Sequence, residues 1–377
     1  MLLITVWSTY GPYHLARVRS LLEVFDRSRL MCFSHCRTDD TYSFFNLRPA
    51  NSLVLVDRPA SELLFFQSLC ATLRAFWLHN PDLILTCGYE RPETLAAVIW
   101  AKLKGRTVFL MLDNQLDDSP RNFFVELVKR YYLRIFDGFV YGGDTHKNYL
   151  RHLGVPQNKE VNGYNCVDNE SIWSGVTTAR QSSTPLFSAN DYFLCVARLI
   201  KKKNLPRLIR AYASYVHRMP PAERPWSLVI CGDGPEREEL QAIAKQCGVC
   251  DKVVFVGLVS DFSDMLNYYA FARALILASH ENEQWGLVVN EAMASGLPVV
   301  VSEQCGCASS LVQNFQNGFR FDGNSVEALA THLSWLHDHE SDLSAMGVRS
   351  REIVSEYSPA NFAAKVFGLY QSRRRDQ

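Results

Sequence analysis

The stretch from Ser279 to Ser302 constrains the fold more than any other part of the sequence. It follows a short apolar run, Ala274–Leu277, that predicts a buried strand, and it opens with a polar loop. We predict that a helix starts near Trp285 or Gly286 and ends at Gly296-Leu297-Pro298, because glycine followed by proline commonly ends a helix. The apolar residues after it have the composition of a second buried strand. Strand, loop, helix and strand in this order predict one right-handed crossover of a parallel sheet.

The loop of this crossover is a predicted ligand site. The first turn of a helix has free backbone N–H groups, and Gly286 carries no side chain that would block an approaching phosphate. Two carboxylates frame the turn, since Glu283 precedes it and Glu291 lies inside the helix. A carboxylate accepts hydrogen bonds and can hold two neighbouring hydroxyls. Anion-binding amides between two such carboxylates suit a sugar, a diphosphate and a ribose in a row, which predicts a nucleotide-sugar as the ligand.

The sequence around these carboxylates carries a family resemblance. Seven residues separate Glu283 from Glu291, within a frame of Gly-Leu, Glu-Ala-Met-Ala and Gly-Leu-Pro-Val-Val. This frame resembles the signature of glycosyltransferase family 4, whose members are retaining enzymes of the GT-B fold. The resemblance implies that Glu283 holds the donor sugar, that the amides of Gly286 and Leu287 bind the diphosphate, and that Glu291 binds the ribose hydroxyls. The alternative is an acidic surface loop before an ordinary amphipathic helix.

A basic run follows another predicted strand, Tyr192–Val196. Within it, Arg198 and Lys203 occupy the positions of an arginine and a lysine that contact the donor diphosphate in the family that the chain resembles. Fixed cations at the end of a strand can stabilise the charge that develops on a leaving diphosphate, in place of a metal ion. We therefore expect Glu283, Arg198 and Lys203 to be catalytic, with no metal and no other cofactor. Lys201 and Lys202 are expected to be solvated, and the alternative for the whole run is a surface patch.

Glycines after three other predicted strands are expected near the donor. Gly232 follows the apolar run Leu228–Cys231 and begins Gly-Asp-Gly-Pro, which the resembling family places beside the nucleotide. Gly257 follows Val253–Val256, where backbone atoms of the family meet the base. Gly11 follows the N-terminal strand, where the family's loop lies under the donor phosphates. The third glycine of a dinucleotide fingerprint is absent from the Gly232 loop, which disfavours NAD.

Polar residues near the ends of the first strands are candidates for acceptor binding. Three of them, Tyr13, His14 and Arg17, follow the Gly11 loop, and a helix-capping or surface role is the alternative for them. The other candidates, which follow the predicted strand Thr107–Met111, are Asp117, Asp118 and Arg121. The alternative for that segment is a helix start, with Ser119 as the N-cap and Pro120 in the first turn. Many members of the family carry a histidine there, and this chain has none, so we assign no such role.

The composition changes between Gly175 and Asn190, where Ser, Thr and Gln replace the apolar runs. Such residues are typical of a linker, and we place a domain boundary there. We predict an α/β protein of the GT-B fold, with two Rossmann-like, doubly wound parallel-sheet domains facing a central cleft. Residues 1–184 would form the acceptor-side domain and residues 185–377 the nucleotide-sugar domain. The resemblance implies that the last helix packs back on the first domain.

Charge, hydropathy and cysteine usage limit the partners of the chain. Lysine plus arginine and aspartate plus glutamate both number 39 among the 377 residues, so global charge gives no argument for nucleic acid. No apolar run approaches the roughly 18 residues that a membrane span needs. The start of the chain reads as a strand rather than a signal peptide.

The eleven cysteines are an odd number, which favours free thiols and a cytoplasmic location. Two close cysteine pairs could be half of a zinc site, but neither has a second pair, so we expect structural thiols and no metal.

The predicted helix from Asn122 to Phe136 is amphipathic and basic. Its apolar side carries Phe123, Leu127, Tyr131 and Ile135, and its basic residues are Lys129, Arg130 and Arg134. A helix of this kind can lie on an anionic membrane surface, which would give peripheral contact with the cytoplasmic face of a membrane. The alternative is a core helix with a solvated face.

These observations predict a retaining glycosyltransferase that moves a hexose-type sugar from a nucleotide-diphospho-sugar to an acceptor hydroxyl. The expected setting is polysaccharide, lipopolysaccharide or other glycoconjugate biosynthesis. An epimerase or phosphorylase with a similar site, a dehydrogenase and a non-catalytic partner subunit are the alternatives, the last of which would be expected to lack Glu283, Arg198 or Lys203. The sequence leaves open the base (UDP, GDP or ADP), the acceptor (a saccharide, a lipid-linked or a small molecule) and the oligomeric state.

Overall fold

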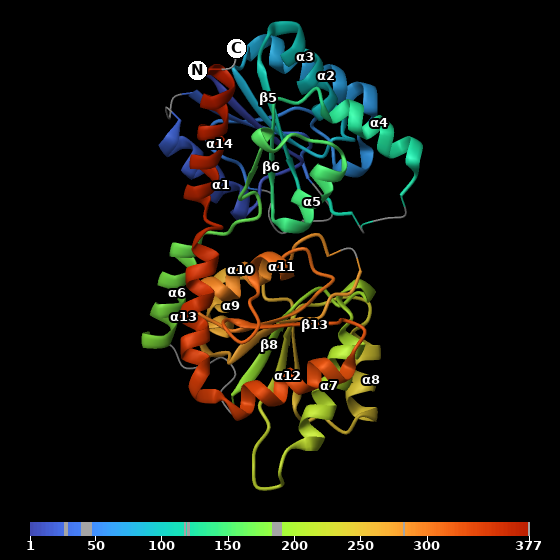
Figure 1. The fold of residues 1–377 in the computed structure, drawn as a ribbon, viewed down its shortest axis with the longest axis vertical. Coiled ribbons are helices and arrows are strands. Elements are labelled where there is room, and N and C mark those ends of the chain that lie inside the picture. Colours follow the sequence, from blue (N-terminus) through green and yellow to red (C-terminus); the bar gives the residue numbers. More distant parts are fainter. Residues whose placement is uncertain are drawn as a thin grey trace. The chain divides into compact units, whose positions relative to one another are not determined.

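The computed structural model describes residues 1–25, 29–38, 47–116, 118, 121–182, 191–281 and 283–375. The chain divides into two compact units: unit 1 comprises Met1–Val167 and Tyr357–Gln377, and unit 2 comprises Asp168–Glu356. Each unit is built around one parallel sheet with helices packed against it (Figure 1). Parallel strands that are covered on both faces read as continuous apolar runs, which is the pattern in both halves of the sequence.

Unit 1 contains a seven-stranded sheet in the order β3-β2-β1-β4-β5-β6-β7. Its strands are β1 (Leu3–Trp7), β2 (Leu30–Ser34), β3 (Ser52–Val54), β4 (Leu83–Cys87), β5 (Thr107–Leu112), β6 (Gly138–Tyr141) and β7 (Glu160–Asn162). Its α-helices are α1 (Pro12–Val24), α2 (Phe65–His79), α3 (Pro92–Lys104), α4 (Phe123–Leu133), α5 (Asp144–His152) and α14 (Pro359–Arg375). The rings of Phe33 and Phe76 lie 5.8 Å apart, and Trp100 lies 5.8 Å from Phe76, so aromatic packing joins the sheet to α2 and α3.

Unit 2 contains a six-stranded sheet in the order β10-β9-β8-β11-β12-β13. Its strands are β8 (Tyr192–Val196), β9 (Ser227–Cys231), β10 (Val253–Gly257), β11 (Ala274–Leu277), β12 (Val299–Ser302) and β13 (Gly318–Phe321). Its α-helices are α6 (Asn169–Ser182), α7 (Leu205–Arg218), α8 (Arg237–Gln246), α9 (Phe262–Phe271), α10 (Leu287–Ala294), α11 (Ala308–Leu311), α12 (Val326–Asp338) and α13 (Leu343–Ser355). The strands β11 and β12 pair in parallel, with Leu275 opposite Val299, and α10 connects them. The crossover predicted from the sequence is therefore confirmed.

The division between the units differs from the boundary predicted after residue 184. The helix α6 precedes that boundary, yet it packs within unit 2. The guanidinium of Arg180 donates hydrogen bonds to the carbonyls of Ala270, at 2.9 Å, and Ser295, at 3.2 Å. Arg351 of α13 lies over the ring of Trp173, at 3.4 Å from its centroid. The linker predicted from Gly175 onward overlaps the second half of α6, and these long-range contacts place the helix in unit 2.

The helix α14 belongs to unit 1, although it follows all of unit 2 in the chain. The ring of Phe367 meets Phe25, at the end of α1, edge to face at 5.1 Å. The ammonium of Lys365 donates to the side-chain oxygen of Asn162 at 2.8 Å. Unit 1 is therefore assembled from two segments of the chain.

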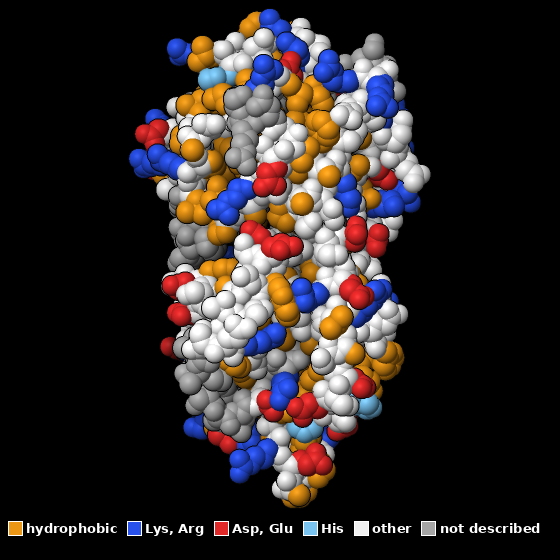
Figure 2. Space-filling model, turned by 90° about the vertical axis from the view of Figure 1, so that its left-hand side faces the viewer, with side chains coloured by type: hydrophobic (Ala, Val, Ile, Leu, Met, Phe, Trp, Pro, Cys, Tyr) orange, Lys and Arg blue, Asp and Glu red, His pale blue; other side chains and the backbone are white. Residues whose placement is uncertain are grey.

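The surface carries both signs of charge. Figure 2 shows lysine and arginine side chains interspersed with aspartate and glutamate on the face that it presents of each unit, in keeping with the equal numbers in the sequence. Among the residues that the structure describes, no helix has both the length and the apolar content that crossing a membrane requires.

Candidate functional site

The loop between β11 and α10 depends on a glycine. Gly286 is the N-cap of α10 and has φ = 102°, a left-handed conformation that glycine adopts without strain. A Cβ atom at this position would lie 2.6 Å from Cδ2 of Leu277, closer than packed carbon atoms come. Both the backbone conformation and the space therefore require glycine, and the amides of the first turn of α10 are left unobstructed by a side chain at the cap.

Glu283 lies just before this turn and is buried. The Lys203 ammonium forms a hydrogen-bonded ion pair with Oε2 of Glu283, and the Ser279 hydroxyl donates to the same oxygen at 2.9 Å. Burial opposes the charged form, but the charge and hydrogen bond of Lys203 outweigh it and hold the pKa of Glu283 below its ordinary value. The carboxylate is therefore ionised at neutral pH and accepts hydrogen bonds only.

Lys203 reaches Glu283 because of a tight turn after β8. Residues Lys201–Lys203 form a short 3-10 helix that ends at Asn204, which has φ = 55°. The Asn204 amide donates to the carbonyls of Ala278, at 3.1 Å, and Gly323, at 2.9 Å. Sequence reasoning missed Asn204; its signal is that asparagine tolerates a left-handed conformation better than most residues. Lys202 was expected to be solvated, and its ammonium instead lies 3.8 Å from Oε1 of Glu283.

Glu291 lies inside α10, with only 3% of its surface exposed. The buried hydroxyl of Tyr269, on α9, donates to Oε2 of Glu291 at 2.7 Å. A carboxylate has about four acceptor positions; this bond occupies one of them and fixes the side chain. Tyr269 is a second residue that sequence reasoning missed, because nothing in a single sequence pairs α9 with α10.

The loops after β8, β9 and β10 meet at their backbones, which explains their glycines. A Cβ at Gly232 would lie 1.9 Å from the Ala197 carbonyl oxygen, so only glycine fits against that strand end. The Gly232 amide donates to the Gly257 carbonyl at 2.7 Å, and Gly257 has φ = 89°. Arg198 lies in the first of these loops and is exposed, and no ion pair within the described residues includes it.

Most of the predicted donor residues lie at one end of the unit 2 strands, whereas Gly11 lies in unit 1, at the N-cap of α1. Glu283 and Lys203 are in contact, and Gly286 follows them at the start of α10. Arg198 and Gly232 follow β8 and β9, and Gly257 is the last residue of the neighbouring strand β10. The carboxyl ends of parallel strands lie on the same side of a sheet. This end of the strands combines cations, helix amides and a buried carboxylate that accepts hydrogen bonds.

In unit 1, the loop after β1 has a defined capping contact. The Gly11 amide donates to Nδ1 of His14 at 3.0 Å. Burial and the nearby charge of Arg17 lower the pKa of His14 to about 3, so the ring is neutral near pH 7 and carries its proton on Nε2. The guanidinium of Arg17 is buried and lies 4.7 Å from the centre of the Tyr164 ring. His14 thus has the capping role considered as its alternative, and its Nε2 proton is the group that remains for an acceptor.

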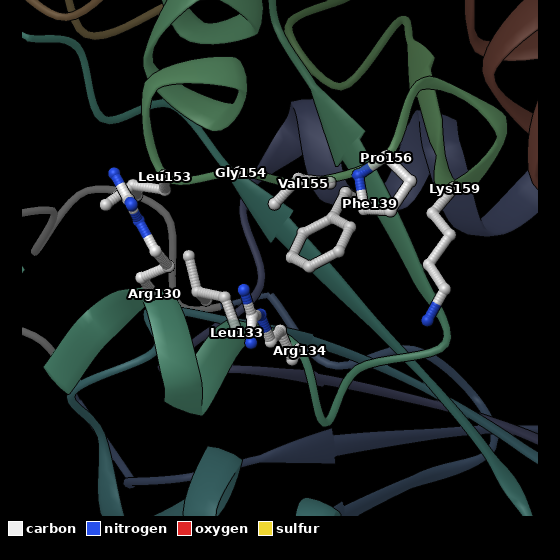
Figure 3. Close-up of a pocket in the computed structure, with 9 residues that line it drawn as sticks. All are labelled: Arg130, Leu133, Arg134, Phe139, Leu153, Gly154, Val155, Pro156 and Lys159. Atoms are coloured by element: carbon white, nitrogen blue, oxygen red, sulfur yellow. The ribbon is translucent and has the colours of Figure 1, made fainter. Parts of the chain in front are cut away.

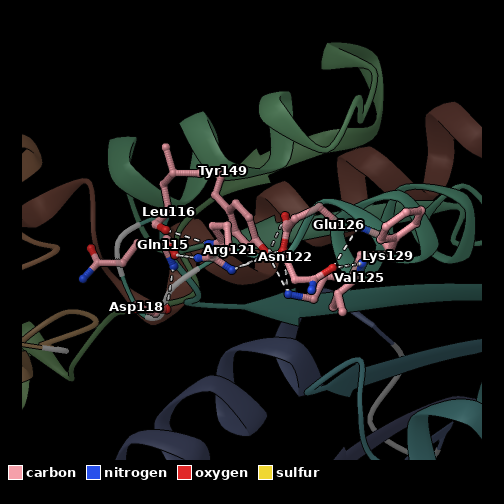
Figure 4. Close-up of polar contacts among 10 residues, drawn as sticks. Gln115, Leu116, Asp118, Arg121, Asn122, Val125, Glu126, Lys129 and Tyr149 are labelled. Atoms are coloured by element: carbon pink, nitrogen blue, oxygen red, sulfur yellow. Dashed lines mark hydrogen bonds and ion pairs between the residues drawn. The ribbon is translucent and has the colours of Figure 1, made fainter.

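The segment after β5 is held by Arg121 (Figure 4). Its guanidinium donates to the carbonyl oxygens of Gln115 and Leu116 and to the Tyr149 hydroxyl, the last two at 2.7 and 3.0 Å. The Asp118 carboxylate accepts from the Gln115 amide at 2.8 Å. Arg121 therefore fixes this loop internally. Asp117 lies outside the described residues, as do Ser119 and Pro120.

The start of α4 differs from the alternative in which Ser119 caps the helix. Asn122 is the N-cap, and its side-chain oxygen accepts from the amides of Phe124, at 3.0 Å, and Val125, at 3.3 Å. Asparagine is among the preferred N-cap residues. Sequence reasoning also passed over Asp113, directly after β5; burial and the charge of Asp118 raise the pKa of its carboxyl, a shift frequent at functional sites.

The cysteines form no cross-links. All eleven are free thiols, and no group of three or more metal-ligating side chains comes together within the described residues. Cys305 and Cys307 are buried behind the Glu283 loop, and burial raises the pKa of both thiols. They pack as apolar groups in the core.

Comparisons with known proteins found a family match within unit 2. Residues 178–353 match the family described as glycosyl transferases group 1. A protein of Mycobacterium tuberculosis, GDP-mannose-dependent alpha-(1-6)-phosphatidylinositol monomannoside mannosyltransferase, is 32% identical over 180 residues. That match covers 46% of this chain and 45% of the relative, so it spans less than half of the length of either protein.

Two solved structures share the fold over nearly the whole chain. Sucrose-phosphate synthase from Thermosynechococcus elongatus has a TM-score of 0.74 at 19% identity and covers 100% of both chains. HepE of Anabaena, solved with UDP and glucose, has a TM-score of 0.74 at 18% identity and covers 99% of this chain and 100% of its own. Residues 178–353, within unit 2, therefore resemble the group 1 glycosyl transferases, and the chain has the GT-B fold of these solved structures.

Proposed function

We propose that the protein transfers a hexose-type sugar from a nucleotide-diphospho-sugar to an acceptor hydroxyl, with retention at the anomeric carbon. The observation that carries this proposal is the ion pair of Glu283 and Lys203 beside the glycine-capped start of α10. An ionised carboxylate suits sugar hydroxyls, and cations with helix amides suit a diphosphate. Similar proteins support a nucleotide-sugar donor, since the relative from Mycobacterium tuberculosis is GDP-mannose-dependent and HepE was solved with UDP and glucose.

Each donor residue has a distinct task in this proposal. Glu283 accepts hydrogen bonds from the hydroxyls of the donor sugar. Lys203 and Arg198 stabilise the negative charge that develops on the diphosphate as the bond to the sugar breaks. The amides of Gly286 and Leu287 bind the diphosphate, and Glu291, oriented by Tyr269, binds the ribose hydroxyls.

The same cations make a metal unnecessary in the proposed reaction. A divalent ion on a diphosphate serves to neutralise charge on the leaving group, and Lys203 and Arg198 supply fixed positive charge for that purpose. We expect turnover to persist in excess EDTA. Loss of activity on chelation, restored by one added divalent metal, would contradict this part of the proposal.

The acceptor is proposed to bind at the loops of unit 1. The candidates are the Nε2 proton of His14 and the carboxylates of Asp113 and Asp118, which follow β1 and β5. We propose that Arg121 acts on the acceptor indirectly, by holding the Asp118 loop. A polysaccharide, lipopolysaccharide or other glycoconjugate precursor is the acceptor class that we propose.

A thermal-shift screen with UDP, GDP, ADP and their sugar conjugates tests the proposal. One nucleotide class should raise the melting temperature of the protein, because a ligand that binds only the folded state stabilises it. Glu291→Gln removes the negative charge that is proposed to attract the ribose hydroxyls, while it keeps an oxygen that can accept from Tyr269. The rise in melting temperature should therefore be smaller in that variant. An absence of any shift in the wild-type protein would argue against a preformed donor site and in favour of a non-catalytic subunit.

We also propose peripheral contact with a membrane surface through α4. Only Leu133 of this helix is buried, and Phe124 and Val128 are 74% and 68% exposed. Large exposed apolar patches are uncommon on monomeric proteins and mark interaction surfaces. The single acidic residue of α4, Glu126, is paired with Lys129 at 2.9 Å. Phe124→Ser with Val128→Ser should abolish co-sedimentation with anionic vesicles, and failure of the wild-type protein to bind any vesicle would end this proposal.

A further inference from the structure

A cavity of about 320 Å³ lies in unit 1 where α4 ends (Figure 3). Its basic lining residues are Arg130, Arg134 and Lys159. Its apolar walls include Phe139 and Val155. Figure 3 shows Arg130 at one end of this group, Lys159 at the other, and Arg134 beneath Phe139. The cavity thus combines three positive charges with an apolar interior wall.

None of these cations has an acidic partner within the described part of the chain. Arg130 donates to the His152 carbonyl at 3.0 Å, and Lys159 donates to the Phe136 carbonyl at 3.3 Å. The guanidinium of Arg134 lies 5.1 Å from the centre of the Tyr131 ring. These contacts orient the three side chains and leave their charge uncompensated.

The acidic residues nearby in the sequence are engaged elsewhere. Glu126 pairs with Lys129 and Arg121, at 2.9 and 3.4 Å. Asp137 pairs with Lys102 at 2.7 Å. Among the described residues, no carboxylate lines the cavity, so an anion that enters it meets no negative group from this part of the chain.

The cavity is separate from the proposed acceptor site. It lies at the amino ends of β6 and β7, since Phe139 is near the start of β6 and Lys159 immediately precedes β7. The loops with His14 and Asp118 follow the carboxyl ends of β1 and β5. The two groups of residues therefore lie at opposite ends of the parallel strands of unit 1.

The cavity adjoins the exposed apolar face of α4. Arg130 and Leu133 belong to the last turn of the helix, two and five residues after Val128. The Tyr131 side chain is also exposed, at 60%. Basic and apolar groups meet at the end of this helix. A membrane that takes up the apolar side chains of α4 would therefore bring its polar headgroup layer close to the three cations.

We propose that this cavity binds the phosphate of an anionic lipid headgroup while α4 rests on the membrane surface. The guanidinium groups supply paired donors for phosphate oxygens, and the Lys159 ammonium supplies a third cation. The apolar walls suit the glycerol carbons next to the phosphate. This inference rests on the proposed membrane contact of α4 and is independent of the proposed transferase reaction.

The test is co-sedimentation of the full chain with vesicles of phosphatidylcholine, with and without phosphatidylglycerol. Three variants separate the cavity from general surface charge. The first is Arg130→Gln with Arg134→Gln and Lys159→Gln, which removes the three cations. The second is Val155→Phe, which fills the cavity and keeps every charge. The third, a control, is Arg19→Gln with Arg374→Gln and Arg375→Gln, which removes as many charges from α1 and α14.

Binding to the anionic vesicles should weaken by about tenfold or more in the first variant, since each basic residue at a membrane surface contributes roughly 1 kcal/mol. Val155→Phe should weaken it as well, and the control should leave it unchanged. Full binding by a folded Val155→Phe protein would show that surface charge alone acts, and it would overturn the cavity site. Equal losses in the first and third variants would overturn it too.

A second measurement distinguishes a lipid from a free phosphate and does not depend on any variant folding. Glycerol 1-phosphate should displace the wild-type protein from anionic vesicles, whereas glycerol at the same concentration should not. Calorimetric binding of inorganic phosphate without any vesicle binding would reject the lipid and assign the cavity to a soluble phosphate. Vesicle binding that glycerol 1-phosphate does not reduce would reject the headgroup. A protein inactive as a transferase would still give these results.

Discussion

The ion pair of Glu283 and Lys203 shows how two residues far apart in sequence set each other's state. Lys203 keeps the buried carboxylate ionised, and the carboxylate holds the ammonium at the sheet edge where a diphosphate is proposed to leave. Truncation of either side chain leaves a buried charge with an incomplete partner, which is costly. The pair therefore supports the local fold as well as the proposed chemistry.

Lys203→Ala should lower kcat/KM for sugar transfer by a factor equivalent to about 2–4 kcal/mol, the range for one preorganised electrostatic group. The measurement is initial-rate kinetics with the donor found by thermal shift. Lys201→Ala is the matched control, because Lys201 is the exposed residue of the same short helix. Near-normal turnover in Lys203→Ala would remove this residue from the site.

His14 should make the stability of unit 1 depend on pH. Its pKa is about 3 in the folded protein, below the ordinary 6.5, so the unfolded chain binds a proton that the folded chain does not. Stability therefore falls as the pH drops from 6.5 toward 3, by about 2 kcal/mol at about pH 5. His14→Gln keeps an acceptor for the Gly11 amide, as in a capping box, and does not titrate. Urea unfolding should show a weaker loss between these pH values in that variant; an identical loss would contradict the buried neutral ring.

At the scale of elements, the start of α10 should tolerate no side chain at its cap. Gly286→Ala places an alanine in a left-handed conformation, which costs about 1–2 kcal/mol. Its Cβ would also lie 2.6 Å from Leu277, which adds a steric clash. Gly105→Ala is the control, because Gly105 has φ = 61° and nothing within 4 Å of the added atom. Chemical denaturation should show the greater loss of stability for Gly286→Ala. Equal losses would mean that the loop can move away from Leu277 without cost.

The elements also show what the sequence could and could not predict. The crossover from β11 through α10 to β12 was predictable, because apolar runs and a glycine–proline stop are local signals. The placement of α6 was not, since Arg180 and Trp173 find their partners far along the chain. The same holds within the site: Glu283, Lys203 and Gly286 lie in recognisable motifs, whereas Tyr269 and Asn204 act through contacts that only the fold creates.

At the scale of the whole molecule, the two units have separate hydrophobic cores. Apart from Gly11, the predicted donor residues belong to unit 2. A nucleotide that binds there should raise the unfolding temperature of unit 2 more than that of unit 1, because stabilisation by a ligand is confined to the part that it binds. Differential scanning calorimetry with and without the nucleotide would resolve the two transitions. A single transition that shifts as one would contradict independent units.

The return of α14 to unit 1 has a consequence for how the protein is made. The ribosome delivers nearly all of unit 1 first, then all of unit 2, and only afterwards the helix that packs on α1. Domains generally fold as units while synthesis continues. Unit 1, which leaves the ribosome first, is thus among the last parts to complete its fold. A nascent chain halted after Glu356 should expose the face of α1 on which α14 packs, and a chaperone that recognises apolar surface should bind it.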